Sequence, residues 1–196
     1  MTSELQQAAG DTQTRDRLIA VAVDLFRRYS YAGTSLQMIA DELGFTKGAI
    51  YHHFRTREEL LRAIVAPMIG QLEVIVSGAE KHRTAGARAE HMLAGYADHL
   101  AANRRLAAVL ALDPGVLRVL RANPEWSRVI SRQTVLLAAV NPGQAGRARA
   151  TFAMAGMAAA ADPRVANLDD DSLRQVLMDT GRRALGLRSP RRQPRD

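Results

Sequence analysis

Apolar residues recur at helical spacing along almost the whole chain, whereas strict alternation of apolar and polar positions is scarce. Residues 16–29 carry their apolar side chains on one helical face, and the stretch 36–43 repeats the i, i+3, i+4, i+7 spacing of an amphipathic helix. Further helical patterns cover residues 47–53 and run from Thr56 towards Ser77. The pattern therefore predicts an all-α protein.

Residues that cap or break helices mark the ends of these elements. Thr34 with Gln37, and Thr56 with Glu59, have the capping-box spacing of a helix start. Gly44 is expected to end the second helix, because glycine enters the left-handed region without steric strain. Later breaks divide the chain into about nine helices in all, and they fall at 84–86, 113–115, 123–124, 141–143 and 162–163.

Composition narrows the class of protein. The chain has 196 residues, of which 47% are hydrophobic and 24% charged, as in a globular protein with a full core. It has no cysteine, which excludes disulfides, thiolate zinc sites and thiol nucleophiles. The N-terminal residues lack the apolar core of a signal peptide, and the Ala-rich run 153–161 is too short to span a membrane. We expect a cytoplasmic protein with no membrane association.

The net charge of +7 suggests a nucleic-acid partner, but its distribution gives little support. Residues 1–64 carry eight basic and eight acidic side chains, whereas residues 65–196 carry nineteen and twelve. Six arginines lie in the last fifteen positions, and we expect residues 189–196 to be a disordered basic tail. A DNA-binding prediction must therefore rest on where particular residues lie.

The stretch GFTKGAIYHHF, residues 44–54, holds three of the nine aromatic residues and two of the five histidines. Two short helices joined by a tight turn, with a packing helix before them, have the layout of a helix-turn-helix. Thr46 is expected to cap the second short helix, and Ile50 to close a small core with Phe45 and Phe54. The tyrosine and both histidines then remain on the surface, which favours a surface that enters the DNA major groove.

A metal site at the adjacent histidines, His52 and His53, is disfavoured. Neighbouring residues on a helix point about 100° apart and do not easily share one ion. No cysteine is present, and no nearby carboxylate completes a ligand set. We therefore expect no metal and no cofactor.

The stretch from Thr14 to Val65 closely resembles the DNA-binding domain of the tetracycline-repressor (TetR) family. The combined pattern is specific, although a lone helix-turn-helix would be a weak signal. It covers about a quarter of the chain, and the remainder resembles the family in being all-helical and of the right length. The matching positions are Phe26, Thr34-Ser35, Ile39-Ala40, Gly44, the run Lys47-Gly48-Ala49-Ile50-Tyr51, Phe54 and Glu59-Leu60-Leu61.

The resemblance implies which residues contact double-stranded DNA. Lys47 and Ala49 would face base edges, Gly48 would let the backbone approach closely, and the histidines would lie near phosphates. Tyr51 would lie along the backbone and the pyrimidine methyls, and the planar guanidinium of Arg57 suits a phosphate. Capped helix starts point their N–H groups at phosphate oxygens. The expected DNA-binding residues are Thr34, Ser35, Thr46, Lys47, Gly48, Ala49, Tyr51, His52, His53 and Arg57.

The resemblance also divides the chain into domains. A flexible lead, residues 1–13, would precede a tri-helical helix-turn-helix domain, residues 14–60. Residues 61–188 would form a larger helical bundle for effector binding and dimerisation. One position departs from the family pattern: Ser30 stands after the first helix where the family prefers glycine, and it is expected to strain or reshape that turn.

In this family the larger domain encloses an effector pocket and forms a four-helix dimer interface. The expected effector is small and largely hydrophobic, with contacts from Met68, Leu72, Met92, Tyr96, His99, Trp126 and Phe152. Ala- and Gly-rich residues near 144–161 and the apolar stripe over 170–186 are expected at the dimer interface. The residues are Ala153, Gly156, Met157, Leu173, Leu177, Thr180 and Ala184. Packing of these stripes within one chain is the alternative.

The sequence thus predicts a sequence-specific DNA-binding transcriptional regulator. We expect a homodimeric repressor that binds a palindromic operator and is released by a small hydrophobic effector. Two alternatives stay open: a helical adaptor that binds only protein, and a small-molecule enzyme built on a helical bundle. Against an enzyme stand the missing cysteine, the lack of a Gly-x-Ser-x-Gly elbow and the lack of a phosphate loop.

Overall fold

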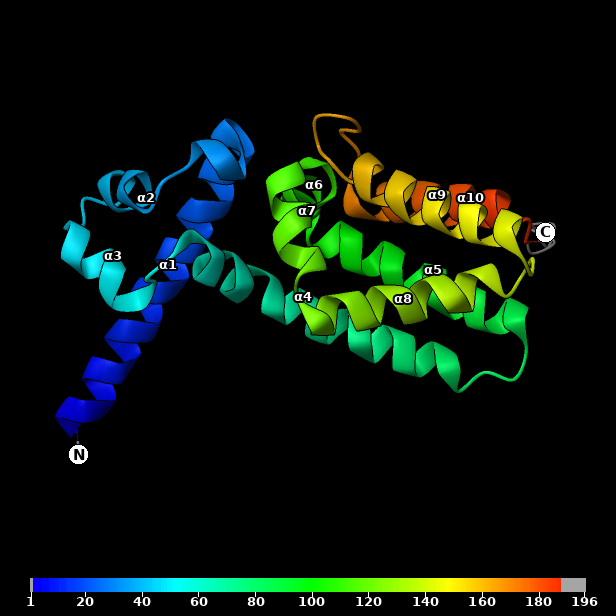
Figure 1. Ribbon diagram of the computed structural model, residues 1–196, viewed down its shortest axis with the longest axis horizontal. Coiled ribbons are helices and arrows are strands. Elements are labelled where there is room, and N and C mark those ends of the chain that lie inside the picture. Colours follow the sequence, from blue (N-terminus) through cyan, green and yellow to red (C-terminus); the bar gives the residue numbers. More distant parts are fainter. Residues whose placement is uncertain (1, 188–196) are drawn as a thin grey trace, which may run out of the picture.

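The computed structural model describes residues 2–187, which form an all-α protein, as predicted (Figure 1). Ten helices lie within these residues, close to the nine expected from the sequence. They are α1 Thr2–Gly33, α2 Leu36–Glu42, α3 Lys47–His53, α4 Arg57–Glu80, α5 Ala85–Ala102, α6 Arg104–Leu112, α7 Pro114–Arg121, α8 Pro124–Ala138, α9 Gln144–Ala160 and α10 Asp170–Leu185. The predicted tail, residues 189–196, lies outside the described residues.

The helices form two lobes joined by one long helix. Figure 1 shows α1, α2 and α3 in a small lobe, and α4 running from it into a larger lobe made by the later helices. Leu18, Ile39, Ile50 and Leu60 are fully buried in the small lobe, so its core joins α1, α2, α3 and the start of α4. In the larger lobe, α5 packs against α4, α8 and α10.

Side-chain caps begin the two short helices of the small lobe. Ser35 Oγ accepts a hydrogen bond from the Met38 N–H at 3.1 Å, and Thr46 Oγ1 accepts one from the Ala49 N–H at 3.3 Å. The cap of α3 is the predicted one, whereas the prediction for α2 was one residue too early. Thr34 is buried and its hydroxyl donates to the Ser30 carbonyl at 2.8 Å, so it does not cap α2.

The turn after α2 and the start of α4 follow the prediction. Gly44 has a φ of +66°, the left-handed conformation that glycine adopts without strain. The Phe45 N–H then donates to the Ala40 carbonyl at 2.8 Å, which closes the end of α2. Thr56 Oγ1 accepts from the Glu59 N–H at 3.1 Å and begins α4.

Helix α1 differs from its prediction at both ends. It begins at Thr2, so the segment expected to be a flexible lead is helical. At the other end Ser30 interrupts the helical backbone with φ 65° and ψ 166°, the one positive φ outside glycine among residues 2–187. A β-carbon crowds the backbone at this combination of φ and ψ, which glycine adopts far more readily than serine.

Ser30→Gly is expected to raise the free energy of unfolding by about 0.5–1 kcal/mol. Relief of the strain, about 1–2 kcal/mol, exceeds the extra chain entropy of glycine and the lost bond from the Gly33 N–H to Ser30 Oγ. For a chain of this size we expect the Tm to rise by about 1–4 °C in a thermal melt followed by circular dichroism. Ser30→Ala keeps the strain and loses the hydroxyl, so its Tm should fall. A glycine variant that melts below the wild type would contradict this account.

Helix α4 is long and apolar enough, by length and composition, to cross a membrane. In this fold it is a partly buried core helix, with Leu61, Ile64, Met68 and Leu72 packed against the neighbouring helices. Its apolar stripe is therefore explained by the core of the protein.

Candidate nucleic-acid interface and ligand cavity

Helix α3 presents one polar face to solvent. Ile50 in its middle and Phe54 after it are buried, which fixes the opposite face outward. Tyr51 remains 43% exposed, and Lys47 Nζ lies 5.7 Å from the centroid of its ring, in cation–π range. Because residues one turn apart share a helix face, these two side chains present a basic and aromatic surface together.

Gly48 lies on the same exposed part of α3, and the fold does not require a glycine there. A β-carbon added at this position would meet only Thr46 Oγ1, at 3.9 Å. Glycine in a helix costs about 0.5–1 kcal/mol relative to alanine. Gly48 thus leaves the surface of α3 open to close approach from outside the chain, a property that Gly70 on α4 shares.

Two predicted DNA-binding residues point inward instead. Thr34 is buried and bonded to the Ser30 carbonyl, so its hydroxyl does not face solvent. The His53 side chain is only 7% exposed, and its Nε2 lies 3.6 Å from a carboxylate oxygen of Asp11 on α1. His52 stays exposed, as predicted, with its Nε2 3.9 Å from the same oxygen. The helical N-terminal part of α1, absent from the prediction, thus reaches the end of α3.

Arg57, predicted to bind a phosphate, is engaged within the protein. Its Nη1 donates to the carbonyl oxygens of Tyr31, Ala32 and Thr34 at 2.9, 2.9 and 2.7 Å. Its guanidinium carbon lies 5.2 Å from the centroid of the Tyr31 ring. These carbonyls belong to the end of α1 and the link to α2, where a helix leaves acceptors without partners. Arg57 therefore joins α4 to the strained end of α1.

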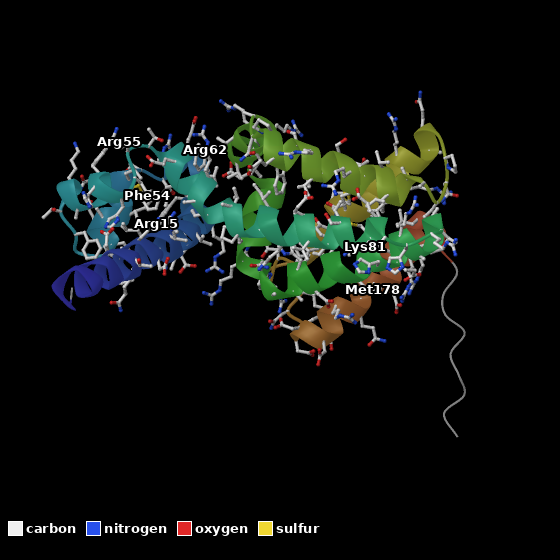
Figure 2. All side chains as sticks on the ribbon, turned by 90° about the horizontal axis from the view of Figure 1, so that it is seen from below. Arg15, Phe54, Arg55, Arg62, Lys81 and Met178 are labelled. Carbon is white, nitrogen blue, oxygen red and sulfur yellow. The ribbon has the colours of Figure 1, made fainter. Side chains whose placement is uncertain are left out.

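Other arginines of the small lobe have different surroundings (Figure 2). Arg15 and Phe54 lie together, with the guanidinium carbon 5.4 Å from the ring centroid. Arg62 is exposed and forms only a 3.4 Å pair with Glu58, one turn away on α4. Arg55 is exposed, and its backbone N–H donates to Glu59 at 2.8 Å. Of these, Arg55 has the side chain best placed for an external partner.

A hydrogen bond joins the small lobe to the larger one directly. The Tyr31 N–H, next to the Ser30 kink, donates to Asp113 Oδ2 at 2.6 Å. The other carboxylate oxygen of Asp113 accepts from the Gly115 and Val116 N–H groups at 2.8 and 3.2 Å, capping α7. The sequence marked this Asp-Pro-Gly stretch only as a break, because nothing in it reveals a partner 82 residues away.

The larger lobe contains a cavity of about 540 Å³ lined by α4, α5, α6, α7, α8 and α9. Five of the seven predicted effector contacts line it: Met68, Leu72, Tyr96, His99 and Trp126. Two do not. Met92 is buried in the core, and Phe152 is 70% exposed on α9. Sequence reasoning missed the contribution of α7, which supplies Leu117 and Arg121 to the lining.

Two uncharged polar rings line the cavity: His99, which is buried, and Tyr96, which is half-buried. Burial lowers the pKa of His99, and its Nε2 has no hydrogen-bond partner among the described residues. Burial also raises the pKa of the Tyr96 hydroxyl above its usual range. At neutral pH both side chains therefore offer hydrogen-bonding groups without charge.

The predicted dimer residues divide between the inside and the outside of the chain. Gly156 and Thr180 are exposed, Ala184 is partly buried, and Ala153, Met157, Leu173 and Leu177 are buried. The buried ones pack within the chain because α9 and α10 lie against each other and against α5. Within residues 2–187, the exposed large apolar side chains of these two helices are Phe152 and Val176.

The small lobe matches a known family. Residues 18–64 fit the family model described as bacterial regulatory proteins, tetR family. The small lobe thus has the N-terminal domain of the tetR family of bacterial regulatory proteins. The family consists of transcriptional regulators, which disfavours the enzyme alternative.

Curated tetR-family relatives align with the N-terminal part. The transcriptional repressor KstR2 of Rhodococcus jostii is 31% identical over 81 residues, 39% of this chain and 40% of that protein. The transcriptional regulator SrpR of Pseudomonas putida is 36% identical over 67 residues, 34% of this chain and 32% of that protein. The chain thus matches less than half the length of each of these relatives.

Solved tetR-family structures share the whole fold. A regulatory protein from Rhodococcus RHA1 has a TM-score of 0.64 at 20% identity, covering 89% of this chain and 98% of that one. The ketosteroid transcriptional regulator KstR2 of Mycobacterium tuberculosis has a TM-score of 0.67 at 16% identity, covering 88% and 93%. At such identities the likeness extends to the fold of the larger lobe and not to its ligand.

Proposed function

We propose that this chain is a homodimeric repressor that binds a palindromic operator through α3 and releases it when a small hydrophobic effector fills the cavity. Residues 14–60 read the DNA, residues 61–188 bind the effector and dimerise, and the protein acts in the cytoplasm. The DNA set comprises Ser35, Thr46, Lys47, Gly48, Ala49, Tyr51 and His52, of which all but the half-buried Ala49 are exposed. Thr34, His53 and Arg57 support this surface from inside.

The open glycine of α3, together with the exposed Lys47 and Tyr51 on the same helix, is the observation that carries the DNA-binding assignment. Lys47 and Tyr51 alone also fit a solvated helix face, but Gly48 costs helix stability and relieves no crowding within the chain. Close approach of a DNA backbone or base edge accounts for it. Two copies of α3 in a dimer would then require half-sites separated by one or more helical turns.

The effector assignment rests on the cavity and on what related regulators bind. The cavity volume lies within the usual range for small ligands, and most of its lining is apolar. KstR2 of Mycobacterium tuberculosis is described as a ketosteroid regulator. FadR of Bacillus subtilis, with a TM-score of 0.58 at 17% identity, was solved with stearoyl-CoA. Stearoyl-CoA has a large hydrophobic part, as does the kind of ligand that the apolar lining of the present cavity favours.

A short route connects the cavity to the DNA surface. Helix α7 contributes Leu117 and Arg121 to the cavity wall, and Asp113 caps the other end of that helix. The same carboxylate holds the Tyr31 N–H at the end of α1. A ligand that moves α7 would therefore move the small lobe and change the spacing of the two α3 helices in the dimer. Coupling of about 1–3 kcal/mol would weaken operator affinity roughly 5–150-fold.

Gly48→Ala tests the DNA-binding assignment against a matched control. The DNA is a duplex selected from a random library by the wild-type protein. Gly70 on α4 is also an exposed helical glycine whose β-carbon would meet nothing within 4 Å. Both alanine variants should gain stability, by about 0.5–1 kcal/mol. Gly48→Ala alone should lose about tenfold or more in affinity for the selected duplex, measured by fluorescence anisotropy, because one lost specific contact costs about 1–3 kcal/mol.

Equal DNA affinity in the two alanine variants would reject α3 as the reading element. Failure of the wild-type protein to enrich any duplex would instead favour the adaptor that binds only protein. The dependence of DNA affinity on salt concentration distinguishes base-specific contacts from phosphate contacts, since non-specific phosphate binding weakens steeply as salt rises. The selected duplex should therefore keep a tenfold or larger advantage over a scrambled one at each salt concentration.

A further inference from the structure

The cavity lining changes in polarity from its depth to its mouth. The buried lining side chains are Met68, Leu72, Leu100 and Ala107, together with His99. The exposed lining residues are mostly polar: Arg121, Ser127, Ser131 and Thr151. A ligand that fits this gradient has an apolar body with a polar end at the mouth.

The mouth carries one positive charge and no compensating negative charge. Arg121 is the one cationic side chain that lines the cavity, and none of the lining residues is an aspartate or glutamate. The Arg121 guanidinium has no carboxylate within ion-pair distance among residues 2–187. The Ser127 hydroxyl donates to the Arg121 carbonyl at 3.0 Å, which holds the start of α8 beside the end of α7. This edge of the cavity favours an anion.

The deep end carries one polar atom that the protein leaves unpaired. His99 is 5% exposed, and its Nε2 has no hydrogen-bond partner in the described part of the chain. An unpaired buried nitrogen costs about 1–3 kcal/mol, and buried polar groups in native proteins are nearly always paired. Because His99 lines the cavity, an oxygen of a bound ligand can supply the missing partner. A hydroxyl fits either tautomer of the imidazole, since it both donates and accepts.

We propose that the ligand of this cavity is an apolar carboxylic acid with an oxygen at its far end. The carboxylate lies at the mouth against Arg121, with the Ser131 hydroxyl beside it. The apolar body fills the space between α4, α5 and α8, and the distal hydroxyl or carbonyl meets His99 Nε2. This ligand class rests on the proposed function only in taking the cavity as the effector site.

The protein contains its own reporter for this binding site. Trp126 is the sole tryptophan of the chain and lines the cavity, so a bound ligand should change its fluorescence. Three probes share one chain length: dodecanoate, 12-hydroxydodecanoate and 1-dodecanol, each titrated below its aggregation limit into the full-length protein. We expect 12-hydroxydodecanoate to bind about tenfold more tightly than dodecanoate, and dodecanoate about tenfold more tightly than the alcohol.

Two substitutions assign these preferences to their residues. Arg121→Gln should weaken both acids about tenfold and leave dodecanol unchanged, while Arg121→Lys should restore most of the affinity for the acids. His99→Phe keeps an aromatic ring and removes both ring nitrogens, so the two acids should then bind equally. A matched control, Arg118→Gln, changes an exposed arginine of α7 outside this cavity and should alter none of the three affinities.

Several outcomes would overturn the ligand class. If dodecanol binds as tightly as dodecanoate, the ligand needs no carboxylate and the contact with Arg121 is rejected. If His99→Phe still prefers the hydroxylated acid, the contact between the distal oxygen and His99 is rejected. Absence of saturable fluorescence change with all three probes would reject the class altogether. The effector role is measured separately, by DNA affinity with and without 12-hydroxydodecanoate. If the three probes bind with the predicted preferences but the affinity for DNA does not change, the ligand class is supported and the regulatory part of the proposed function is rejected.

Discussion

Arg57→Ala is expected to lower the free energy of unfolding by about 2–4 kcal/mol. One guanidinium nitrogen holds three carbonyl oxygens at the end of α1, and the same group lies over the Tyr31 ring. Hydrogen bonds to a charged donor contribute about 1.5–3 kcal/mol each, and sharing one nitrogen among three acceptors reduces the sum. A thermal melt by circular dichroism should show a fall in Tm on the order of 10 °C.

Two nearby arginines serve as controls for this substitution. Arg55 and Arg62 lie close to Arg57 in sequence and are exposed, and Arg62 makes only a surface pair with Glu58. Exposed pairs of this kind contribute about 0.2–1 kcal/mol, so both alanine variants should melt close to the wild type. Arg57→Lys should recover only part of the loss, because a single ammonium group lacks the planar fork of arginine.

The opposite result would restore the role expected from the sequence. If Arg57→Ala folds as stably as Arg55→Ala but binds all DNA more weakly, with a salt slope reduced by about one unit, Arg57 is a phosphate contact. If Arg57→Ala instead loses stability but binds DNA normally at low temperature, where it is folded, Arg57 is the residue that fixes the end of α1.

The elements of the small lobe could be predicted because their signals are local. Thr46, Gly44 and Thr56 act through backbone groups only a few residues away, so spacing alone identifies their positions. The difference between Thr34 and Ser35 also has a physical cause. Either side chain can cap α2, and the choice depends on the kink at Ser30, whose carbonyl takes the Thr34 hydroxyl.

Contacts between distant segments could not be predicted in this way. The sequence predicted a phosphate contact for Arg57, because the three carbonyl oxygens that it binds lie 23 to 26 residues earlier in the chain. Asp113 appeared as a turn residue because its second partner, the Tyr31 N–H, is in the other lobe. The charge of a side chain indicates which kinds of group it can bind, but only the fold determines which of those groups lie within bonding distance.

The spacing of apolar residues identified the apolar faces of α9 and α10, but it did not show whether the same chain or a second chain packs against them. Leu173 and Leu177 form a regular stripe, which suits a partner chain or the protein's own core equally well. The structure buries both inside the chain. Phe152 shows the reverse error: an aromatic residue among alanines was expected in a pocket, and it lies on the surface. The side of α9 that faces out is therefore the better guide to a dimer interface.

Phe152→Glu is expected to convert a homodimer into monomers. Phe152 is 70% exposed on α9, and Val176 of the adjoining α10 is also exposed. A β-carbon at Gly156, one turn further along α9, would meet nothing within 4 Å, so a second chain can approach the helix closely there. In an isologous interface both copies of the phenylalanine are buried, and each glutamate would become an unpaired buried charge. We expect the dimer dissociation constant to rise at least 100-fold, since each of the two central aromatic residues contributes about 2 kcal/mol or more.

Light scattering coupled to size-exclusion chromatography measures the mass of each variant at one protein concentration. Val74→Glu is the matched control, because Val74 is 73% exposed on α4 and its substitution should leave the dimer intact. Phe152→Leu keeps an apolar side chain and should remain dimeric. Ala153→Glu is a poor test, since that residue is buried and its substitution should damage the fold itself. A dimeric Phe152→Glu with wild-type circular dichroism would place the interface elsewhere, and a monomeric Val74→Glu would move it to α4.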